Sequence, residues 1–233
     1  MLFFIKVFVL MIVLGTVILN ATTAGIVAKV LDVLLSKSNG ILIIGASKAS
    51  RLIASYLQNL GKRVVLIDAN TSFIEQSTNQ GLESYAVNIY DDDLTDNIEL
   101  NDIGYLIALT GSDAVNKFAL KNLASTFGEH GAFRLASADE VKNKNFGNNN
   151  QFFSPKDDYI NLSEAVRDFP NLYEIPIHSD KDYRETLEKL HLQLESIPLF
   201  VKTTDNNIYV LSEFETKKLP TKDTVLVYVG QEI

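Results

Sequence analysis

The stretch ILIIGASKASRLIASYLQNLGKRVVLID, residues 41–68, decides the fold of this chain. It opens with a short apolar run that ends on Gly45, which predicts a parallel strand covered on both faces. The next segment repeats apolar residues with a period of 3.6 and ends at Gly61, which predicts an amphipathic helix with a glycine cap. VVLID (64–68) predicts a second buried strand that ends on an acid. The stretch is therefore a strand–helix–strand unit.

Strand and helix signals continue to alternate after this unit. SFIE (72–75) predicts the start of a helix with a capping box, and Gly81 predicts its end. Further strands are expected at YLIALTG (105–111) and AFRLAS (132–137), with a helix between them that starts at Asp113. This alternation predicts an α/β fold with a Rossmann-like, mostly parallel sheet and right-handed crossovers.

The turn after the first strand carries the candidate chemistry. In the place of a G-x-G-x-x-G fingerprint stand Gly45, Ala46, Ser47, Lys48, Ala49 and Ser50. The turn must let backbone N–H groups approach a pyrophosphate at a helix N-terminus, and serine is small enough for the two missing glycines. Asp68, followed by Ala69, is placed to accept hydrogen bonds from an adenosine ribose and to disfavour a 2′-phosphate. The pattern favours NAD-like or adenine nucleotides over NADP.

An apolar segment precedes this unit. Val7 to Ala28 is free of charges and lies between Lys6 and Lys29, and as a helix it would be roughly 33 Å long, enough to span a bilayer. A cleaved signal peptide is the alternative, but apolar character resumes and continues to Leu35. Basic residues concentrate after the helix. The positive-inside rule therefore predicts a single pass through the cell inner membrane with a cytoplasmic C-terminal part.

Three polar residues, Asn20, Thr22 and Thr23, lie near the end of the apolar segment. A lone helix facing lipid would carry them at a cost, whereas neighbouring helices could satisfy them. We therefore expect this helix to belong to a larger membrane bundle.

Composition excludes several functions. The 29 acidic and 21 basic residues give a net charge of −8, which argues against nucleic acid as a partner. The absence of cysteine excludes disulfides and thiolate chemistry. His130, His178 and His191 lack ligand spacing, so no metal site is expected. Carboxylates at 91–93 would suit a hard cation, but a solvated loop before a helix is the favoured interpretation.

The Asn-rich segment NKNFGNNNQ (143–151) predicts a flexible linker. We therefore divide the chain into a membrane helix with a short linker (1–36), a nucleotide-binding domain (37–146) and a small C-terminal α+β lobe (147–233). In that lobe the sequence predicts helices at 163–169 and 180–192 and strands at 197–202, 208–213 and 224–229, with turns at 205–207 and Pro220.

The run ALTGSDAVN (108–116) adds a second motif to the fingerprint. Residues 40–140 resemble the TrkA-N domain, also called the regulator of K+ conductance (RCK) domain, whose fourth strand ends in a Thr-Gly-Asp-Asp-x-x-Asn-like motif. Here the matching residues are Thr110, Gly111, Asp113 and Asn116. The resemblance implies that Gly45, Ser47 and Ser50 line the pyrophosphate, that Asp68 binds the ribose, and that Thr110 and Gly111 reach the nucleotide. Where the family carries Gly-Asp after its third strand, this chain has Val87-Asn88, and Asn88 is expected near the adenine.

A narrower resemblance involves the membrane segment. LGTVILNATTAGIVAKVL (14–31), running into ILIIGAS, is similar to the last transmembrane helix and cytoplasmic tail of bacterial monovalent cation:proton antiporters of the Na+/H+ type. In that family the tail is a regulatory module. With one span and no acid within it, this chain should not transport ions alone. The expected partners are a transmembrane antiporter body and further copies of the chain, as a homodimer or higher homo-oligomer through the Rossmann domain.

The leading hypothesis is a regulatory module that senses NAD, NADH or an adenine nucleotide, with no catalytic residues. One alternative is a membrane-anchored NAD-dependent oxidoreductase, which needs a proton donor or acceptor beside its substrate. None of the nine tyrosines has the lysine four residues later that short-chain dehydrogenases use. The other alternative is a ligand-free dimerisation scaffold, which the two missing glycines favour.

Overall fold

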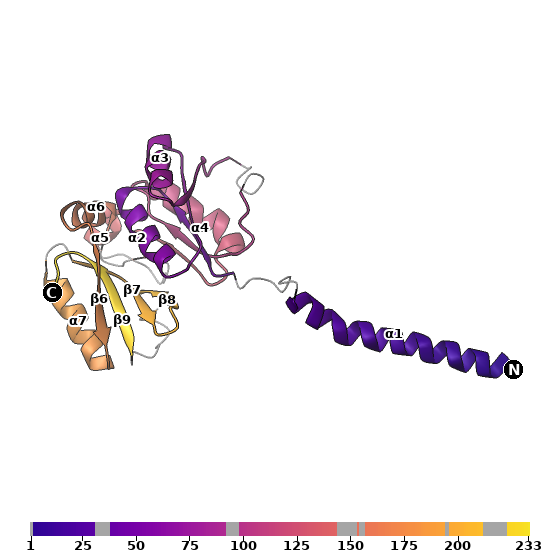
Figure 1. Ribbon diagram of the computed structural model, residues 1–233. Coiled ribbons are helices and arrows are strands. Elements are labelled where there is room, and N and C mark those ends of the chain that lie inside the picture. The colour runs from indigo at the N-terminus through magenta and orange to yellow at the C-terminus, as the bar shows by residue number, and fades with distance from the viewer. Residues whose placement is uncertain are drawn as a thin grey trace. The chain divides into compact units, whose positions relative to one another are not determined.

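The computed structural model describes residues 2–30, 38–91, 98–143, 153, 157–193, 196–211 and 223–233 (Figure 1). The chain forms two compact units, Met1–Ser38 and Asn39–Ile233. The first unit contains helix α1 (Leu2–Val30), and the second contains all the remaining elements.

Helix α1 contains a stretch, Phe4–Thr23, that is long and apolar enough to cross a membrane. A signal sequence near an N-terminus would meet the same measure of length and composition. The hydroxyls of Thr22 and Thr23 donate hydrogen bonds to the carbonyl oxygens of Ile18 and Leu19, at 2.8 and 2.7 Å. The helix backbone thus accepts hydrogen bonds from these two hydroxyls, and the expectation that the helix belongs to a larger membrane bundle stays a prediction.

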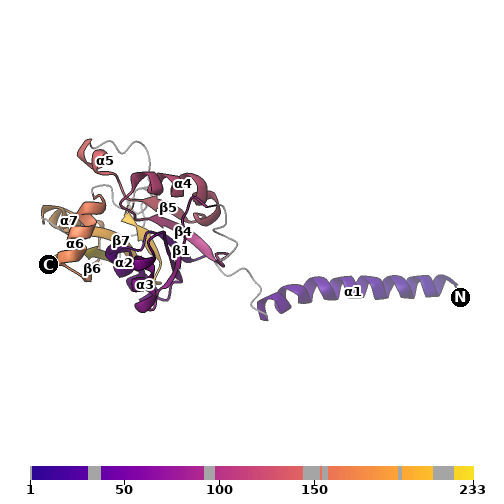
Figure 2. The same ribbon diagram turned by 90° about the horizontal axis from the view of Figure 1, so that it is seen from above.

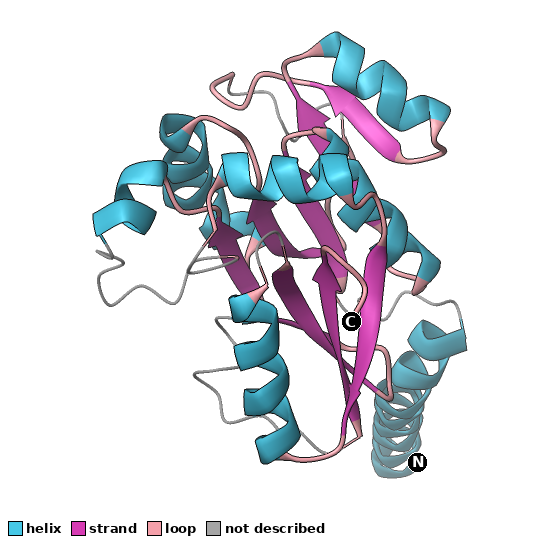
Figure 3. Ribbon diagram, turned by 90° about the vertical axis from the view of Figure 1, so that its left-hand side faces the viewer, coloured by secondary structure: helices cyan, strands magenta, loops and turns pink. Residues whose placement is uncertain are grey.

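The second unit is built on a five-stranded parallel sheet in the order β3-β2-β1-β4-β5 (Figure 3). Its strands are β1 (Gly40–Ile44), β2 (Val64–Asp68), β3 (Glu83–Ala86), β4 (Ile103–Ala108) and β5 (Gly131–Arg134). Its helices are α2 (Lys48–Asn59), α3 (Thr71–Asn79), α4 (Asp113–Phe127) and α5 (Ala138–Asn143). The strand order reverses between β1 and β4, as in a Rossmann sheet. The predicted fold class is therefore confirmed.

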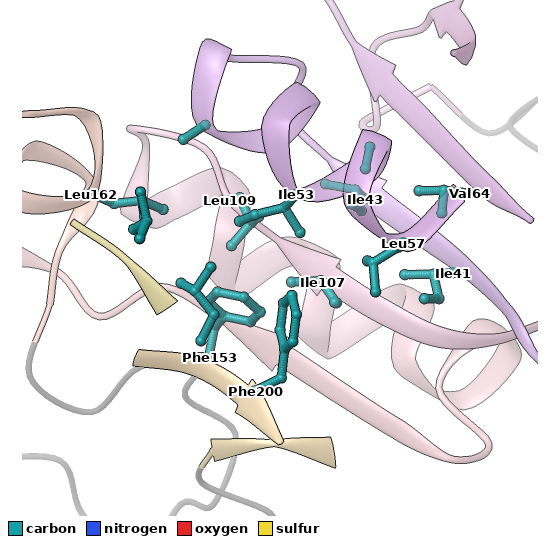
Figure 4. Packing of buried hydrophobic residues seen from close by; sticks show 14 of the residues in the cluster. Ile41, Ile43, Ile53, Leu57, Val64, Ile107, Leu109, Phe153, Leu162 and Phe200 are labelled. Atoms are coloured by element: carbon teal, nitrogen blue, oxygen red, sulfur yellow. The ribbon is translucent and has the colours of Figure 1, made fainter. Parts of the chain in front are cut away.

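Alternate residues of β1 point to opposite faces of the sheet. Ile41 and Ile43 pack in a hydrophobic cluster with α2, which Figure 4 shows from close by. Leu42 and Ile44 pack in a second cluster with α4. Figure 2 shows α2 and α4 on opposite sides of the sheet. Because both faces are covered, the strand is apolar throughout its length.

A second, antiparallel sheet follows, in the order β6-β9-β7-β8. Its elements are α6 (Tyr159–Asp168), β6 (Leu172–Ile177), α7 (Asp180–Leu192), β7 (Ile197–Thr203), β8 (Ile208–Val210) and β9 (Thr224–Val229). Helix α7 covers one face of this sheet, and the other face joins the cluster of α2 through Phe200 and Val227. The expected antiparallel lobe with a helical cover is present. The sequence interpretation missed β6, an edge strand whose proline, Pro176, interrupts the usual strand pattern.

Local expectations are corrected at α3 and at two strand ends. Helix α3 begins at Thr71 and its N-cap is Asn70, whose side chain accepts a hydrogen bond from the N–H of Ser72. The predicted capping box at Ser72 is therefore wrong, because a better acceptor stands two residues earlier. Strands β4 and β5 end at Ala108 and Arg134, before the predicted ends. The linker at 144–151, the acids at 92–93 and Pro220 lie outside the described residues.

Candidate functional site

A cavity of about 340 Å³ opens at the carboxyl ends of β1, β2 and β4. This is the point where the strand order reverses, and ligands of open α/β sheets bind there. The polar residues around it come from four turns of the parallel sheet and from the start of α6. They are Ser47, Asp68, Asn70, Asn88, Tyr90, Thr110, Ser112 and Tyr159.

Gly45 forms the turn that leads from β1 into the cavity. Its φ is +104°, a conformation that residues with a side chain rarely adopt. A Cβ atom at this position would lie 3.0 Å from Cγ2 of Thr110 and 3.1 Å from the carbonyl oxygen of Leu109. The Gly45 N–H donates to the carbonyl oxygen of Ile67 at 2.7 Å. Only glycine allows the backbone to turn this close to the loop after β4.

The N-terminus of α2 follows this turn and faces the cavity. Ser47 is its N-cap, and the Ser47 Oγ accepts a hydrogen bond from the N–H of Ser50 at 3.2 Å. The first turn of α2 contains no acid, so the positive end of the helix dipole is not neutralised from within the helix. The Ser50 hydroxyl is fully buried and lies 3.1 Å from the Ser47 Oγ. This end of α2 suits an anion such as phosphate, with Ser47 lining the cavity and Ser50 in the packing beneath it.

Asp68 lies at the end of β2 and bonds to two neighbouring turns. Its Oδ2 accepts a hydrogen bond from the N–H of Ala46, and its Oδ1 accepts one from the N–H of Asn70, both at 2.8 Å. The carboxylate therefore ties the β1 turn to the start of α3. Each of its oxygens keeps a second lone pair for a hydroxyl donor in the cavity.

Arg51 stabilises the same turn from the protein interior. Its Nη1 donates to the carbonyl oxygen of Ala46 at 2.6 Å, and its Nη2 donates to Oε1 of Gln76 at 2.9 Å. The side chain is buried, and burial lowers the pKa of the guanidinium from its ordinary value. This cation holds the turn in place from within the fold.

The loop after β4 is held by Asn116 of α4, which is buried. The Asn116 Oδ1 accepts from the Thr110 hydroxyl at 2.7 Å and from the Thr110 N–H at 3.1 Å. The Asn116 Nδ2 donates to the carbonyl oxygen of Thr110 at 2.9 Å. The Asn of the fourth-strand motif therefore has a structural role, because its side chain fixes the loop that carries Thr110 and Gly111.

The structure gathers seven of the predicted site residues around the cavity, and these are Gly45, Ser47, Asp68, Ala69, Asn88, Thr110 and Gly111. Asn88 stands in a turn in which its Oδ1 accepts from the N–H of Tyr90 at 3.2 Å. Five others do not line it: Ala46, Ala49 and Ser50 are buried, Lys48 is exposed at the start of α2, and Asp113 pairs with Lys117 at 2.7 Å. The predicted residues that line the cavity thus lie in the turns after the parallel strands and at the end of β2.

Sequence reasoning missed Tyr159 and Asn70. Asn70 could have been found, because it follows the acid of β2 and is a good N-cap. Tyr159 carries no such signal, because it begins α6, in the segment after the predicted linker, and reaches the cavity only in the folded chain. Among the described residues, no group of three or more potential metal ligands converges on one point.

A parallel sheet with this strand order, a glycine turn before a helix and an acid at the end of β2 define a nucleotide-binding Rossmann-type domain. Residues 41–147 match the family model of the TrkA-N domain. TrkA-N domains are NAD(P)-binding Rossmann domains, so the match supports a nucleotide-binding regulatory domain of that kind. No curated protein matches the chain.

Three solved structures are similar to parts of this chain. The NAD(P)-binding domain of an exopolyphosphatase-related protein from Archaeoglobus fulgidus is 20% identical, with a TM-score of 0.39 over 45% of this chain and 79% of that one. N5-carboxyaminoimidazole ribonucleotide synthetase from Thermus thermophilus is 15% identical, with a TM-score of 0.31 over 83% and 47%. The GsuK RCK domain is 15% identical, with a TM-score of 0.33 over 84% and 44%. The chain thus spans less than half the length of the second and third structures.

Proposed function

We propose that this chain is the regulatory, nucleotide-binding part of a monovalent cation transport system, such as a cation:proton antiporter or a K+ transporter. NAD, NADH or an adenine nucleotide binds in the cavity, with its ribose at Asp68 and its phosphates at Gly45 and Ser47. The observation that carries this proposal is that cavity, at the strand-order reversal of a segment that matches TrkA-N.

Regulation requires the ligand to favour one arrangement of the protein over another. A bound nucleotide can shift such an equilibrium only by its differential affinity for the two arrangements. In our proposal the arrangements are those of a homodimer or higher homo-oligomer, and α1 anchors each copy beside a transmembrane partner. The length and apolar composition of α1 support this role.

We propose binding without catalysis. Both oxygens of Asp68 already accept backbone N–H groups, which suits a carboxylate that positions a ribose. A hydride-transfer enzyme needs a proton donor or acceptor beside its substrate. Among the described residues around the cavity, the ionisable groups besides Asp68 are the phenols of Tyr90 and Tyr159.

Calorimetry on the full chain in detergent tests this proposal, with ADP and NADH as titrants. Asp68→Asn keeps an acceptor for the Ala46 N–H and removes the charge that a ribose hydroxyl prefers. A hydrogen bond to a charged group contributes roughly 1.5–3 kcal/mol, so the affinity should fall by about tenfold or more.

Glu75→Gln is the matched control, because it removes one charge from the exposed surface of α3, away from the cavity. It should leave the affinity unchanged. If both variants bound the nucleotides with equal affinity, the proposal that Asp68 binds the ribose would be wrong. A wild-type chain whose melting temperature no nucleotide raises would instead favour the ligand-free scaffold.

A further inference from the structure

We propose that Tyr159 selects the ligand of the cavity, admitting one nucleoside with its phosphates, as in ADP, and excluding the second nucleoside of a dinucleotide such as NAD. This inference rests on the proposed function and deepens it. Tyr159 lies outside the segment that matches TrkA-N, so the selection comes from a different part of the chain than the nucleotide-binding turn.

The sheet dictates the path that a dinucleotide must follow. With its adenosine ribose at Asp68 and its pyrophosphate at the N-terminus of α2, its second nucleoside must cross the strand-order reversal. That path leads from the end of β1 over the end of β4 toward β5. The residues at the crossing are Thr110 and Gly111, in the loop that follows β4.

The ring of Tyr159 occupies this crossing. A Cβ atom at Gly111 would lie 3.1 Å from both Cδ1 and Cε1 of Tyr159, so the ring packs against the loop after β4. Beyond it lies a second cavity, also of about 340 Å³, beside Ser137 and Asp139. The residues common to both cavities are Thr110, Gly111 and Tyr159, which therefore form the wall between them.

The start of α6 is held firmly behind this wall. The Asp158 Oδ1 accepts from the N–H groups of Ile160 and Asn161, both at 2.9 Å, and caps the helix. A parallel bridge joins Asp158 to Ala136, two residues after β5. Leu162 is buried in the cluster that Figure 4 shows, together with Leu109. The residues before and after Tyr159 in sequence thus hold its backbone in place.

The size of the first cavity agrees with a ligand of one nucleoside. Cavities that bind small molecules measure roughly 300–1,000 Å³, and this cavity of about 340 Å³ lies near the lower limit. ADP has far fewer atoms than NAD and needs no path past β4. The TrkA-N match alone predicts NAD as the ligand, whereas the position of Tyr159 predicts ADP. The relative affinities of the two nucleotides distinguish these predictions.

The test compares the affinities of ADP and NAD for the full chain in detergent by calorimetry. We expect the wild-type chain to bind ADP at least about tenfold more tightly than NAD. Tyr159→Ala should remove most of this preference by raising the affinity for NAD relative to the affinity for ADP. Tyr159→Phe is the matched control, because it keeps the ring and should keep the preference.

Two results would overturn the inference while the proposed function stands. One is a wild-type chain that binds NAD as tightly as ADP, because the ring would then move aside without cost. The other is a Tyr159→Ala variant that binds ADP normally and keeps the wild-type preference. A wild-type chain that binds neither nucleotide would overturn the proposed function, and this inference with it.

Discussion

Replacing Gly45 by alanine tests whether the β1 turn is as tight as the structure shows. Alanine at a φ of +104° is strained by roughly 1–3 kcal/mol. Its Cβ would also lie 3.1 and 3.2 Å from the carbonyl oxygen and carbon of Leu109, which are backbone atoms and cannot rotate away. Overpacking of this kind costs roughly 1–3 kcal/mol. Alanine also restricts the unfolded chain, which stabilises the folded state by about 0.4–1 kcal/mol. The free energy of unfolding should therefore fall by about 3 kcal/mol in total.

Gly61→Ala provides the matched control. Gly61 has a φ of +78°, and a Cβ atom there would meet nothing within 4 Å. The strain in that region is roughly 1–2 kcal/mol and the same gain from the unfolded chain applies, so the net loss should be about 1 kcal/mol. The two variants therefore differ mainly by the contact with the loop after β4.

Thermal unfolding of the full chain in detergent, followed by circular dichroism, measures both losses. For a unit of this size, 1 kcal/mol lowers the melting temperature by roughly 2–4 °C. Gly45→Ala should lower it by about 9 °C and Gly61→Ala by about 3 °C. Equal shifts in the two variants would refute the close approach of Gly45 to Leu109.

Two further predictions concern the polar links of the compact unit. The Tyr56 hydroxyl of α2 donates to Oε1 of Glu174 in β6 at 2.6 Å, so Tyr56→Phe should cost about 1 kcal/mol, and a double-mutant cycle with Glu174→Gln should show coupling between them. Glu140 accepts two hydrogen bonds from Arg134, which lower its pKa from 4.5 to about 2. The stability that this shift contributes should be complete above about pH 4.5 and lost as the pH falls toward 2. An acid dependence of unfolding that Glu140→Gln leaves unchanged would contradict this prediction.

The elements of the parallel sheet could be predicted from local patterns. The run 41–44 is apolar because both of its faces are covered, and Gly45 and Gly61 end their elements because a positive φ favours glycine. The acid at Asp68 was recognisable because it follows a buried strand directly. These features depend on a few neighbouring residues, and a sequence pattern records such features well.

The supporting roles around the cavity could be predicted only in part. Ser50 was expected at the pyrophosphate, yet its hydroxyl is buried beneath Ser47, because α2 packs that side against the sheet. Arg51 gave no sign of its bond to the carbonyl oxygen of Ala46, since basic residues usually remain in solvent. The choice between ligand contact and support depends on how the helix is rotated against the sheet.

The sequence alone was enough to establish the alternation of strands and helices, the glycine turn, the acid at the end of β2 and an apolar helix before them. Each of these features can be predicted from the periodicity or the turn residues of one segment. Folding was needed to bring Tyr159 to Gly111, and to pack the antiparallel sheet against α2. Contacts between segments so distant in sequence leave no local pattern, so the wall that limits the cavity emerges only in the three-dimensional structure.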